Sequence, residues 1–308
     1  MIKNQGGEYN MNFTKGKKII TLSLVLVLFL FTITACSPKE DSITIGSKNF
    51  TESRLLATMF QILIEEKTDL EAEVKEFGGT QLAFAAVKSG DVDVYPEYTG
   101  TAYTVMLDLP AISDADETYT IVKDRFKEDY NLEWLGQLGF NNTYVLTVRE
   151  EMATELNLEK FSDLSDHDQD LVLGTTFEFL ERSDGYPGLQ EHYGFEFAEA
   201  KGFDPGLTYS SLRNGDIDVI DAFSTDGRIK AFNLYTLEDD KQFFPPYYAA
   251  PLVNGETLEK YPELGEALSL LENQITDEEM RQLNYSIDEE GKTEEQVARD
   301  FLQSKGLL

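Results

Sequence analysis

The chain opens with an apolar run that differs from everything after it. Residues 19–35 carry no charged side chain, and Lys15, Lys17 and Lys18 stand just before them. A basic segment followed by an apolar one is typical of a secretory signal. The run is at the short limit for a helix that spans a bilayer. We therefore expect residues 1–35 to be a signal peptide, with translation starting at Met1 or Met11.

The apolar run ends at Cys36, the only cysteine of the chain. It is preceded by Ile33, Thr34 and Ala35, an aliphatic residue and two small ones, which resembles the lipobox of bacterial lipoproteins. A single cysteine forms no disulfide within its own chain. The resemblance implies that Cys36 is acylated, becomes the new N-terminus and begins a lipidated tether over residues 36–42. The alternative is a buried free cysteine near the end of a membrane helix.

From residue 43 onward the hydrophobic pattern alternates between strand and helix periods. Residues 43–45 read as a short strand, and residues 51–67 place apolar side chains on one helical face. A second helix, from residue 80 to a glycine stop at residue 90, precedes a strand over residues 92–95. Alternating strands and helices predict an α/β protein with mostly parallel sheets covered on both faces.

One turn pattern occurs twice. Residues 89–94 read Ser-Gly-Asp-Val-Asp-Val, and residues 214–219 read Asn-Gly-Asp-Ile-Asp-Val. Tyr98 and Phe223 fall at equivalent places, just past the end of each strand. Either this common α/β turn is simply reused, or two similar domains each present a ring to a shared cleft. Ligands of open α/β sheets bind beyond the carboxyl ends of the strands, so both rings are placed to meet one.

Two segments, residues 138–143 and 243–247, are candidates for crossing between such domains. They would leave residues 43–142 and 247–308 in a discontinuous lobe A and residues 143–246 in an inserted lobe B. A two-strand hinge of this kind permits closure around a ligand.

Charge and motif content exclude several classes of function. The net charge of −31 repels nucleic acid and anionic lipid, and its simplest role is solubility. The only histidines, His167 and His192, have no patterned partner. There is no nucleotide-binding loop, nucleophile elbow or cysteine–histidine cluster. We expect no enzyme, no metal and no cofactor.

Four motifs, in order along the chain, carry a resemblance to a known family. They occupy residues 45–52, 93–101, 223–229 and 239–247. In these motifs the sequence resembles the substrate-binding proteins of ABC importers for glycine betaine, carnitine, choline and related compatible solutes, over essentially residues 43–308. The resemblance implies the two-lobed, type II periplasmic-binding-protein-like fold, in which two α/β domains joined by a two-strand hinge close on the ligand.

The resemblance also implies an aromatic cage for a trimethylammonium group. Its positions fall on Tyr98, Tyr144, Phe223 and Tyr247. A quaternary ammonium has no N–H to donate, so carboxylates cannot select it by hydrogen bonds, whereas ring faces attract it.

A second set of positions implied by the resemblance would hold a ligand carboxylate. They are Lys48, Thr101, Asn142 and Arg182. Lys48 is expected at the start of the first helix, where free backbone N–H groups favour an anion. Arg182 can present a bidentate fork; the alternative is a surface salt bridge with Glu181 or Asp184.

The expected function is therefore that of a receptor, lipid-anchored at the outer face of the cytoplasmic membrane, which hands its ligand to a permease driven by an ATPase. Lys48 and Arg182 favour glycine betaine or a similar carboxylated compound over choline. Choline, carnitine and ergothioneine stay open as alternative ligands. An extracellular solute sensor and an exported enzyme stay open as alternative functions.

Overall fold

The computed structural model describes Met1 and residues 42–308. The predicted signal peptide, the lipidation at Cys36 and all but the last residue of the tether lie outside the described residues. Among residues 42–308, no helix is both long and apolar enough to cross a membrane.

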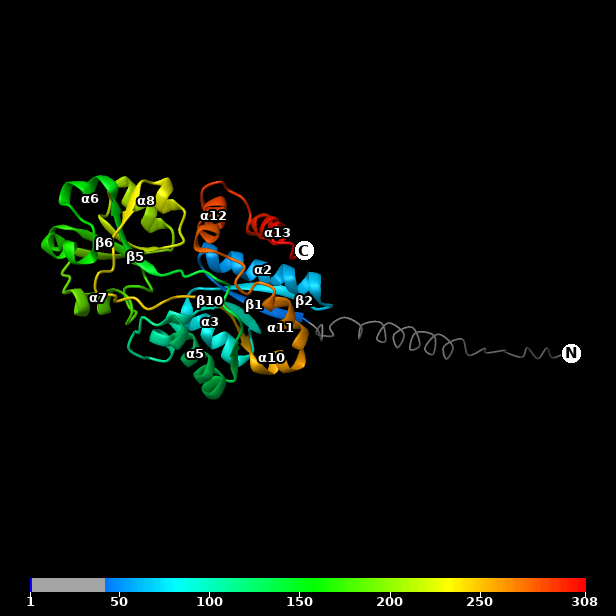
Figure 1. Cartoon of the computed structure of the whole chain (residues 1–308). Helices are drawn as coiled ribbons and strands as arrows, with labels where there is room; N and C mark the ends of the chain where they lie inside the picture. Colours follow the sequence, from blue (N-terminus) through cyan, green and yellow to red (C-terminus); the bar gives the residue numbers. More distant parts are fainter. Residues whose placement is uncertain (2–41) are drawn as a thin grey trace. The chain divides into compact units, whose positions relative to one another are not determined.

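Two five-stranded sheets organise the described chain (Figure 1). Sheet 1 has the order β2-β1-β3-β10-β4 and sheet 2 the order β7-β6-β8-β5-β9. The strands of sheet 1 are β1 (Ser42–Lys48), β2 (Glu71–Phe77), β3 (Val94–Tyr98), β4 (Leu132–Trp134) and β10 (Ala249–Asn254). Those of sheet 2 are β5 (Tyr144–Arg149), β6 (Val172–Thr176), β7 (Glu199–Phe203), β8 (Val219–Phe223) and β9 (Leu234–Thr236).

Both sheets are mixed, so the expectation of mostly parallel sheets is wrong. In sheet 1, β1 pairs parallel with β2 and β3, whereas β10 pairs antiparallel with β3 and β4. In sheet 2, β6 pairs parallel with β7 and β8, whereas β5 pairs antiparallel with β8 and β9. The reason lies in the segments that cross between the sheets. One segment leads into β5, which begins beside the end of β8, and the other leads into β10, which begins beside the end of β3. Each of these strands therefore runs antiparallel to that neighbour.

The helices cover the faces of both sheets. Figure 1 shows α2, α12 and α13 on one side of sheet 1 and α3 and α5 on the other. The helices around sheet 1 are α2 (Thr51–Lys67), α3 (Thr80–Ser89), α4 (Thr99–Thr101), the π-helix η1 (Ala102–Met106), α5 (Ala115–Tyr130), α10 (Gly255–Lys260), α11 (Pro262–Ser269), α12 (Asp277–Asp288) and α13 (Glu294–Ser304). Those around sheet 2 are α6 (Glu150–Leu156), the 3₁₀ helices η2 (Phe161–Asp166) and η3 (Asp168–Asp170), α7 (Tyr186–Tyr193), α8 (Leu207–Asn214) and α9 (Arg228–Ala231).

Several local predictions are confirmed. The helix expected over residues 51–67 is α2, and the one expected to stop at Gly90 is α3. Gly90 and Gly215 both adopt the left-handed conformation, with φ of 80° and 82°, as a glycine helix stop requires. The strand expected over residues 92–95 lies later, at Val94–Tyr98.

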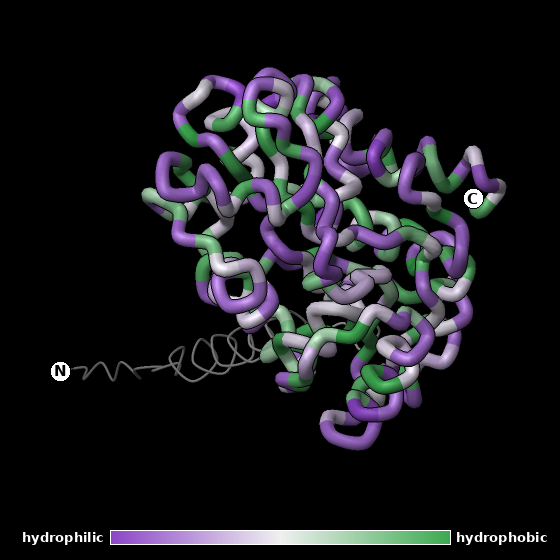
Figure 2. Tube along the Cα trace, turned by 60° about the vertical axis from the view of Figure 1, so that its left-hand side comes forward, coloured by the Kyte–Doolittle hydropathy of each residue, from purple (hydrophilic) through white to green (hydrophobic). Residues whose placement is uncertain are grey.

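The core lies between each sheet and its helices. Every residue of β3 is buried, and α2 packs its apolar face against the sheet and α13. Each fully buried leucine, isoleucine or phenylalanine contributes about 1.5–3 kcal/mol relative to an exposed one. Figure 2 shows hydrophilic stretches along many of the outer loops.

Candidate functional site

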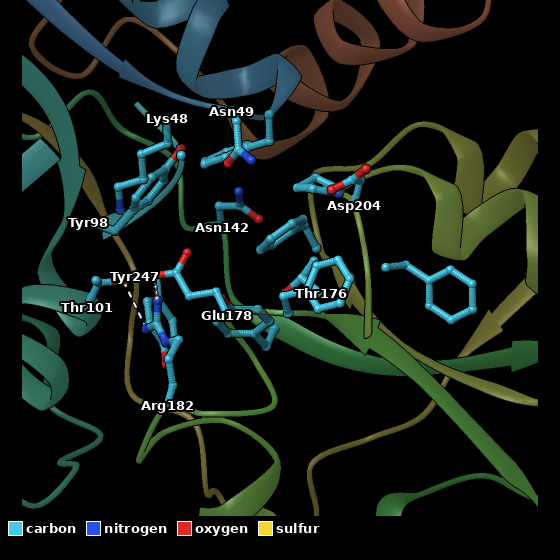
Figure 3. A pocket seen from close by; sticks show the side chains of 17 residues that line it. Lys48, Asn49, Tyr98, Thr101, Asn142, Thr176, Glu178, Arg182, Asp204 and Tyr247 are labelled. Atoms are coloured by element: carbon cyan, nitrogen blue, oxygen red, sulfur yellow. Dashed lines mark hydrogen bonds and ion pairs between the residues drawn. The ribbon is translucent and has the colours of Figure 1, made fainter. Parts of the chain in front are cut away.

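A cavity of about 170 Å³ lies where residues from both sheets meet, at the ends of β3 and β8 (Figure 3). All eight residues that the sequence analysis assigned to ligand binding line this cavity. They are Lys48, Tyr98, Thr101, Asn142, Tyr144, Arg182, Phe223 and Tyr247. The structure thus brings together positions spread over two hundred residues of chain.

Strand register explains why the rings meet. Tyr144, the first residue of β5, stands opposite Phe223, the last residue of β8. In sheet 1, Ala249 at the start of β10 stands opposite Tyr98 at the end of β3. The crossing segments also lie side by side, because the Asn142 N–H donates to the carbonyl oxygen of Tyr247 at 3.0 Å. The rings therefore enter one space from both sheets.

The four predicted rings and a fifth, Phe50, form one aromatic cluster. Ring centroids lie 5.1 Å apart for Tyr144 and Phe223 and 5.6 Å apart for Tyr144 and Tyr247, the latter pair edge to face. Phe50 stacks on Phe223 at 5.6 Å and lies 6.3 Å from Tyr98. Phe50 was not among the predicted cage positions. It is an aromatic residue just past the end of β1, and a ring just past the end of a predicted strand is the signal that had singled out Tyr98.

Hydrogen bonds to buried carboxylates fix two of the tyrosines. The Tyr98 hydroxyl donates to Glu52 Oε1 at 2.7 Å, and the Tyr247 hydroxyl donates to Asp184 Oδ2 at 2.6 Å. Burial and these carboxylates raise the pKa of both hydroxyls well above their usual range. Gly100 makes room for the Tyr247 ring, since a Cβ there would lie 2.6 Å from a ring carbon.

Lys48 lies at the cavity with its charge already paired. It was expected at the start of the first helix, but it is the last residue of β1, and α2 begins at Thr51. Its Nζ lies 2.7 Å from Glu97 Oε1, and both side chains are buried. The same Nζ lies 5.5 Å from the centre of the Tyr98 ring. The ammonium therefore lines the cavity together with its own counter-ion.

Arg182 is likewise paired within the protein. Its Nε and Nη2 donate to the two oxygens of Asp184 at 2.7 and 2.6 Å, and Nη2 also donates to Thr101 Oγ1 at 3.2 Å. A salt bridge with Asp184 was the alternative interpretation of Arg182, but this one is buried rather than on the surface. The guanidinium both lines the cavity and holds an internal carboxylate.

Asp184 stays ionised in this buried setting. Burial opposes its charge, but Arg182 and hydrogen bonds from Tyr247 and Thr104 together lower its pKa. Arg182 and Asp184 therefore form a buried ion pair, and the guanidinium is not a free cation.

Glu52, which the sequence analysis also missed, joins several parts of the site. Its Oε1 accepts hydrogen bonds from Tyr98 at 2.7 Å and from Asn142 Nδ2 at 2.8 Å. Its Oε2 accepts from Thr225 Oγ1 at 2.6 Å and from Asn284 Nδ2 at 2.9 Å. Burial raises its pKa, and the four hydrogen bonds oppose that rise. One buried side chain thus orients two residues of the cavity wall.

The remaining wall residues come mainly from loops after β1, β6 and β7. They are Asn49, Gly78, Thr176, Phe177, Glu178, Phe203, Asp204 and Pro205. Among residues 42–308, no group of three histidine, cysteine, aspartate or glutamate side chains is arranged to hold a metal ion. The cavity wall therefore offers ring faces, hydrogen-bonding groups and paired charges.

Comparison with known proteins places this geometry among transport proteins. A family model described as the substrate-binding domain of ABC-type glycine betaine transport systems matches residues 41–304. The carnitine transport binding protein OpuCC of Listeria monocytogenes is 38% identical over 95% of this chain and 98% of its own length.

Two further matches agree. The ergothioneine transport permease and binding protein EgtU of Helicobacter pylori is 36% identical over 97% of this chain, which spans 55% of that protein's length. A crystal structure of a glycine betaine/carnitine/choline ABC transporter protein matches with a TM-score of 0.71 and 34% identity, over 86% of this chain and 99% of that one. These matches confirm the predicted two-lobed, type II periplasmic-binding-protein-like fold class.

Proposed function

Since the chain belongs to the family of substrate-binding domains of ABC-type glycine betaine transport systems, we propose that its cavity captures a quaternary ammonium compound for import. The observation that carries this proposal is the meeting of ring faces from both sheets in one cavity. We propose Tyr98, Tyr144, Phe223 and Tyr247 as the walls of the ammonium cage, with Phe50 as a fifth.

Cation–π attraction gives the cage its selectivity. Each ring face contributes from about 0.5 kcal/mol when exposed to about 2 kcal/mol when water is excluded. These rings are buried or half-buried, so several contacts together favour a trimethylammonium group. We propose that Lys48, Thr101, Asn142 and Arg182 contact the other end of the ligand, which carries a carboxylate in glycine betaine and carnitine.

The ligand would bind between two lobes. We propose lobe A as residues 43–142 and 247–308 and lobe B as residues 143–246, joined by the two hydrogen-bonded crossing segments. Closure of such lobes around a ligand is a known hinge movement. Hydrogen bonds between the proposed lobes, such as that from Thr225 to Glu52, would help to hold the closed form.

We propose that the protein works outside the cytoplasm with a permease and its ATPase, and that it transfers its ligand unchanged, without catalysis. Acylation at Cys36 would hold it beside the permease and raise its effective concentration there.

Isothermal titration calorimetry with glycine betaine, carnitine, choline and ergothioneine tests the ligand class. We expect at least one to bind with a Kd well below 1 mM, and Tyr144→Ala to abolish that binding. Tyr235→Ala, at an exposed tyrosine of sheet 2, is the matched control and should bind as the unaltered protein does. Failure of all four compounds to bind would refute the proposal.

A further inference from the structure

The cavity wall and the buried partners directly behind it carry more negative than positive charge. Lys48 and Arg182 are its two cations, and each is paired with a buried carboxylate, Glu97 and Asp184 respectively, at 2.7 and 2.6 Å. Glu178 and Asp204 are carboxylates of the wall itself. These six groups together carry a net formal charge of −2.

Glu178 lies where it can contact a ligand. It follows β6, and Figure 3 shows its side chain pointing into the cavity beside Arg182. Its Oε1 accepts a hydrogen bond from the Thr80 backbone N–H at 3.3 Å and lies 3.5 Å from Arg182 Nη1. Within residues 42–308, its Oε2 takes part in no hydrogen bond, and 37% of the side chain is exposed. One oxygen is therefore available to an incoming group.

The surroundings keep this carboxylate ionised. Burial opposes the charge, but Lys48, Arg182 and the hydrogen bond from the Thr80 backbone N–H lower the pKa of Glu178. The absence of a side chain at Gly79 leaves room for the Glu178 carboxylate, because a Cβ at Gly79 would lie 3.2 Å from Glu178 Oε2. An ionised carboxylate accepts hydrogen bonds and cannot donate them.

This arrangement discriminates between ligands by what lies beyond the ammonium group. A carboxylate brought close to Glu178 meets a like charge, which is unfavourable. An O–H or N–H group brought to the same place donates to Oε2 and forms a charge-assisted hydrogen bond, the stronger kind. Glycine betaine has no such donor, whereas carnitine and choline each carry a hydroxyl and ergothioneine carries ring N–H groups.

We infer that Glu178 is a specificity determinant, and that the preferred ligand is a quaternary ammonium compound with an O–H or N–H donor that Glu178 accepts. The inference rests on the proposed function. It replaces the preference for a plain carboxylated betaine, which assumed that Lys48 and Arg182 were free to neutralise a carboxylate.

Calorimetry with matched ligands tests it. Carnitine and γ-butyrobetaine differ only by one hydroxyl, and they are measured with glycine betaine, choline and ergothioneine. We expect at least one donor-bearing compound to bind about tenfold or more tightly than glycine betaine, as a hydrogen bond to a charged group allows. If carnitine is that compound, it should exceed γ-butyrobetaine by a similar factor.

Two variants assign the effect to Glu178. Glu178→Gln should reduce the preference for the donor-bearing compound about tenfold or more, because the amide removes the charge and presents its own N–H groups. Glu181→Gln, which makes the same change at an exposed position of the same loop, should leave the preference unaltered. If Glu178→Gln fails to fold, Glu178→Asp keeps the charge but draws the acceptor back, and the same loss of preference is expected.

The outcomes separate this inference from the proposed function. Glycine betaine binding as tightly as every donor-bearing compound would overturn the role of Glu178 and leave the transport function standing. If Glu178→Gln weakened the binding of all five compounds equally, that result would also overturn the role of Glu178 and leave the transport function standing. Absence of binding by all five to the unaltered protein would instead overturn the proposed function.

Discussion

Thr225 donates a 2.6 Å hydrogen bond to the buried carboxylate of Glu52, and the two residues belong to segments built on different sheets. Thr225 follows β8 of sheet 2, whereas Glu52 belongs to α2, which packs on sheet 1. Glu52 also holds the Tyr98 hydroxyl and the Asn142 amide. The bond therefore connects the segment after β8 to a side chain that orients two residues of the cavity wall.

Thr225→Val keeps the volume of the side chain but removes this hydrogen bond. If the bond forms only when the proposed lobes close, its loss makes the free energy of closure less favourable by about 1.5–3 kcal/mol. We expect the affinity for the ligand to fall roughly 10–100-fold. Calorimetric titration with the tightest-binding ammonium compound measures the loss.

Thr257→Val is the matched control. Thr257 donates an equally short hydrogen bond, 2.6 Å, to Asp93, but within the sheet 1 half and away from the cavity. This variant should lose stability without losing affinity. Unchanged affinity in Thr225→Val would show that the Glu52 bond does not contribute to closure.

The predictions that succeeded rest on local signals. Periodicity gave the bounds of α2, and the glycine stop gave the end of α3, because both depend on neighbouring residues. The eight proposed ligand-binding residues line one cavity, and the resemblance alone supplied their positions. Periodicity carries no information on strand direction, so the antiparallel β5 and β10 were missed.

The pairing of charges could not be predicted for a similar reason. Lys48 and Glu97 are far apart in sequence, and only the register of β1 and β3 brings them together. From residue types alone, Lys48 and Arg182 looked like free cations. Glu178 looked like one acidic residue among the 57 aspartates and glutamates of a very acidic chain. Its position between the two cations depends on the tertiary fold.

Lipidation at Cys36 is testable without a ligand. Cys36→Ala removes the thiol that the lipobox pattern predicts to be acylated. We expect the variant to be released from membranes while binding its ligand with unaltered affinity, because the cavity lies within residues 48–247. Membrane fractionation and calorimetry on the released protein measure the two effects. Retention of the variant in the membrane fraction would contradict the lipid anchor.

Arg182 is predicted to be as important for folding as for binding. Arg182→Met leaves the charge of Asp184 buried without its cation, and breaking a buried pair in this way costs about 3–5 kcal/mol of unfolding free energy. The double variant Arg182→Met with Asp184→Asn should recover much of that loss. Urea unfolding of both variants measures it.

An exposed pair serves as the control for this prediction. Arg125→Met breaks the pair of Arg125 with Asp129, whose side chains are 46% and 33% exposed, and should cost no more than about 1 kcal/mol. If Arg182→Met lowered the free energy of unfolding by no more than Arg125→Met does, the pair with Asp184 would not stabilise the fold. The double variant also tests whether Arg182 contacts the ligand carboxylate. Equal loss of affinity for carnitine and choline would show that it does not.

Asp221 should make stability depend on pH. It is buried in β8, and its carboxyl accepts hydrogen bonds from the backbone N–H and hydroxyl of Thr176, a residue of the cavity wall. Burial raises its pKa from 3.8 to about 8. Between these two values the folded chain binds more protons than the unfolded chain. The free energy of unfolding therefore falls as pH rises through this range and stops falling, for this group, above about pH 8.

Asp221→Asn removes this titration while keeping an acceptor and a donor for Thr176. The difference in unfolding free energy, variant minus unaltered protein, should grow between about pH 4 and pH 8, by at most about 1.4 kcal/mol per pH unit. Above pH 8 it should be constant. Urea unfolding at a series of pH values measures it, and Asp216→Asn, at an exposed position just before β8, corrects for the loss of one acidic residue. A difference that stayed constant from pH 4 to pH 8 would mean that Asp221 is already ionised in the folded protein, with Thr176 supporting its charge.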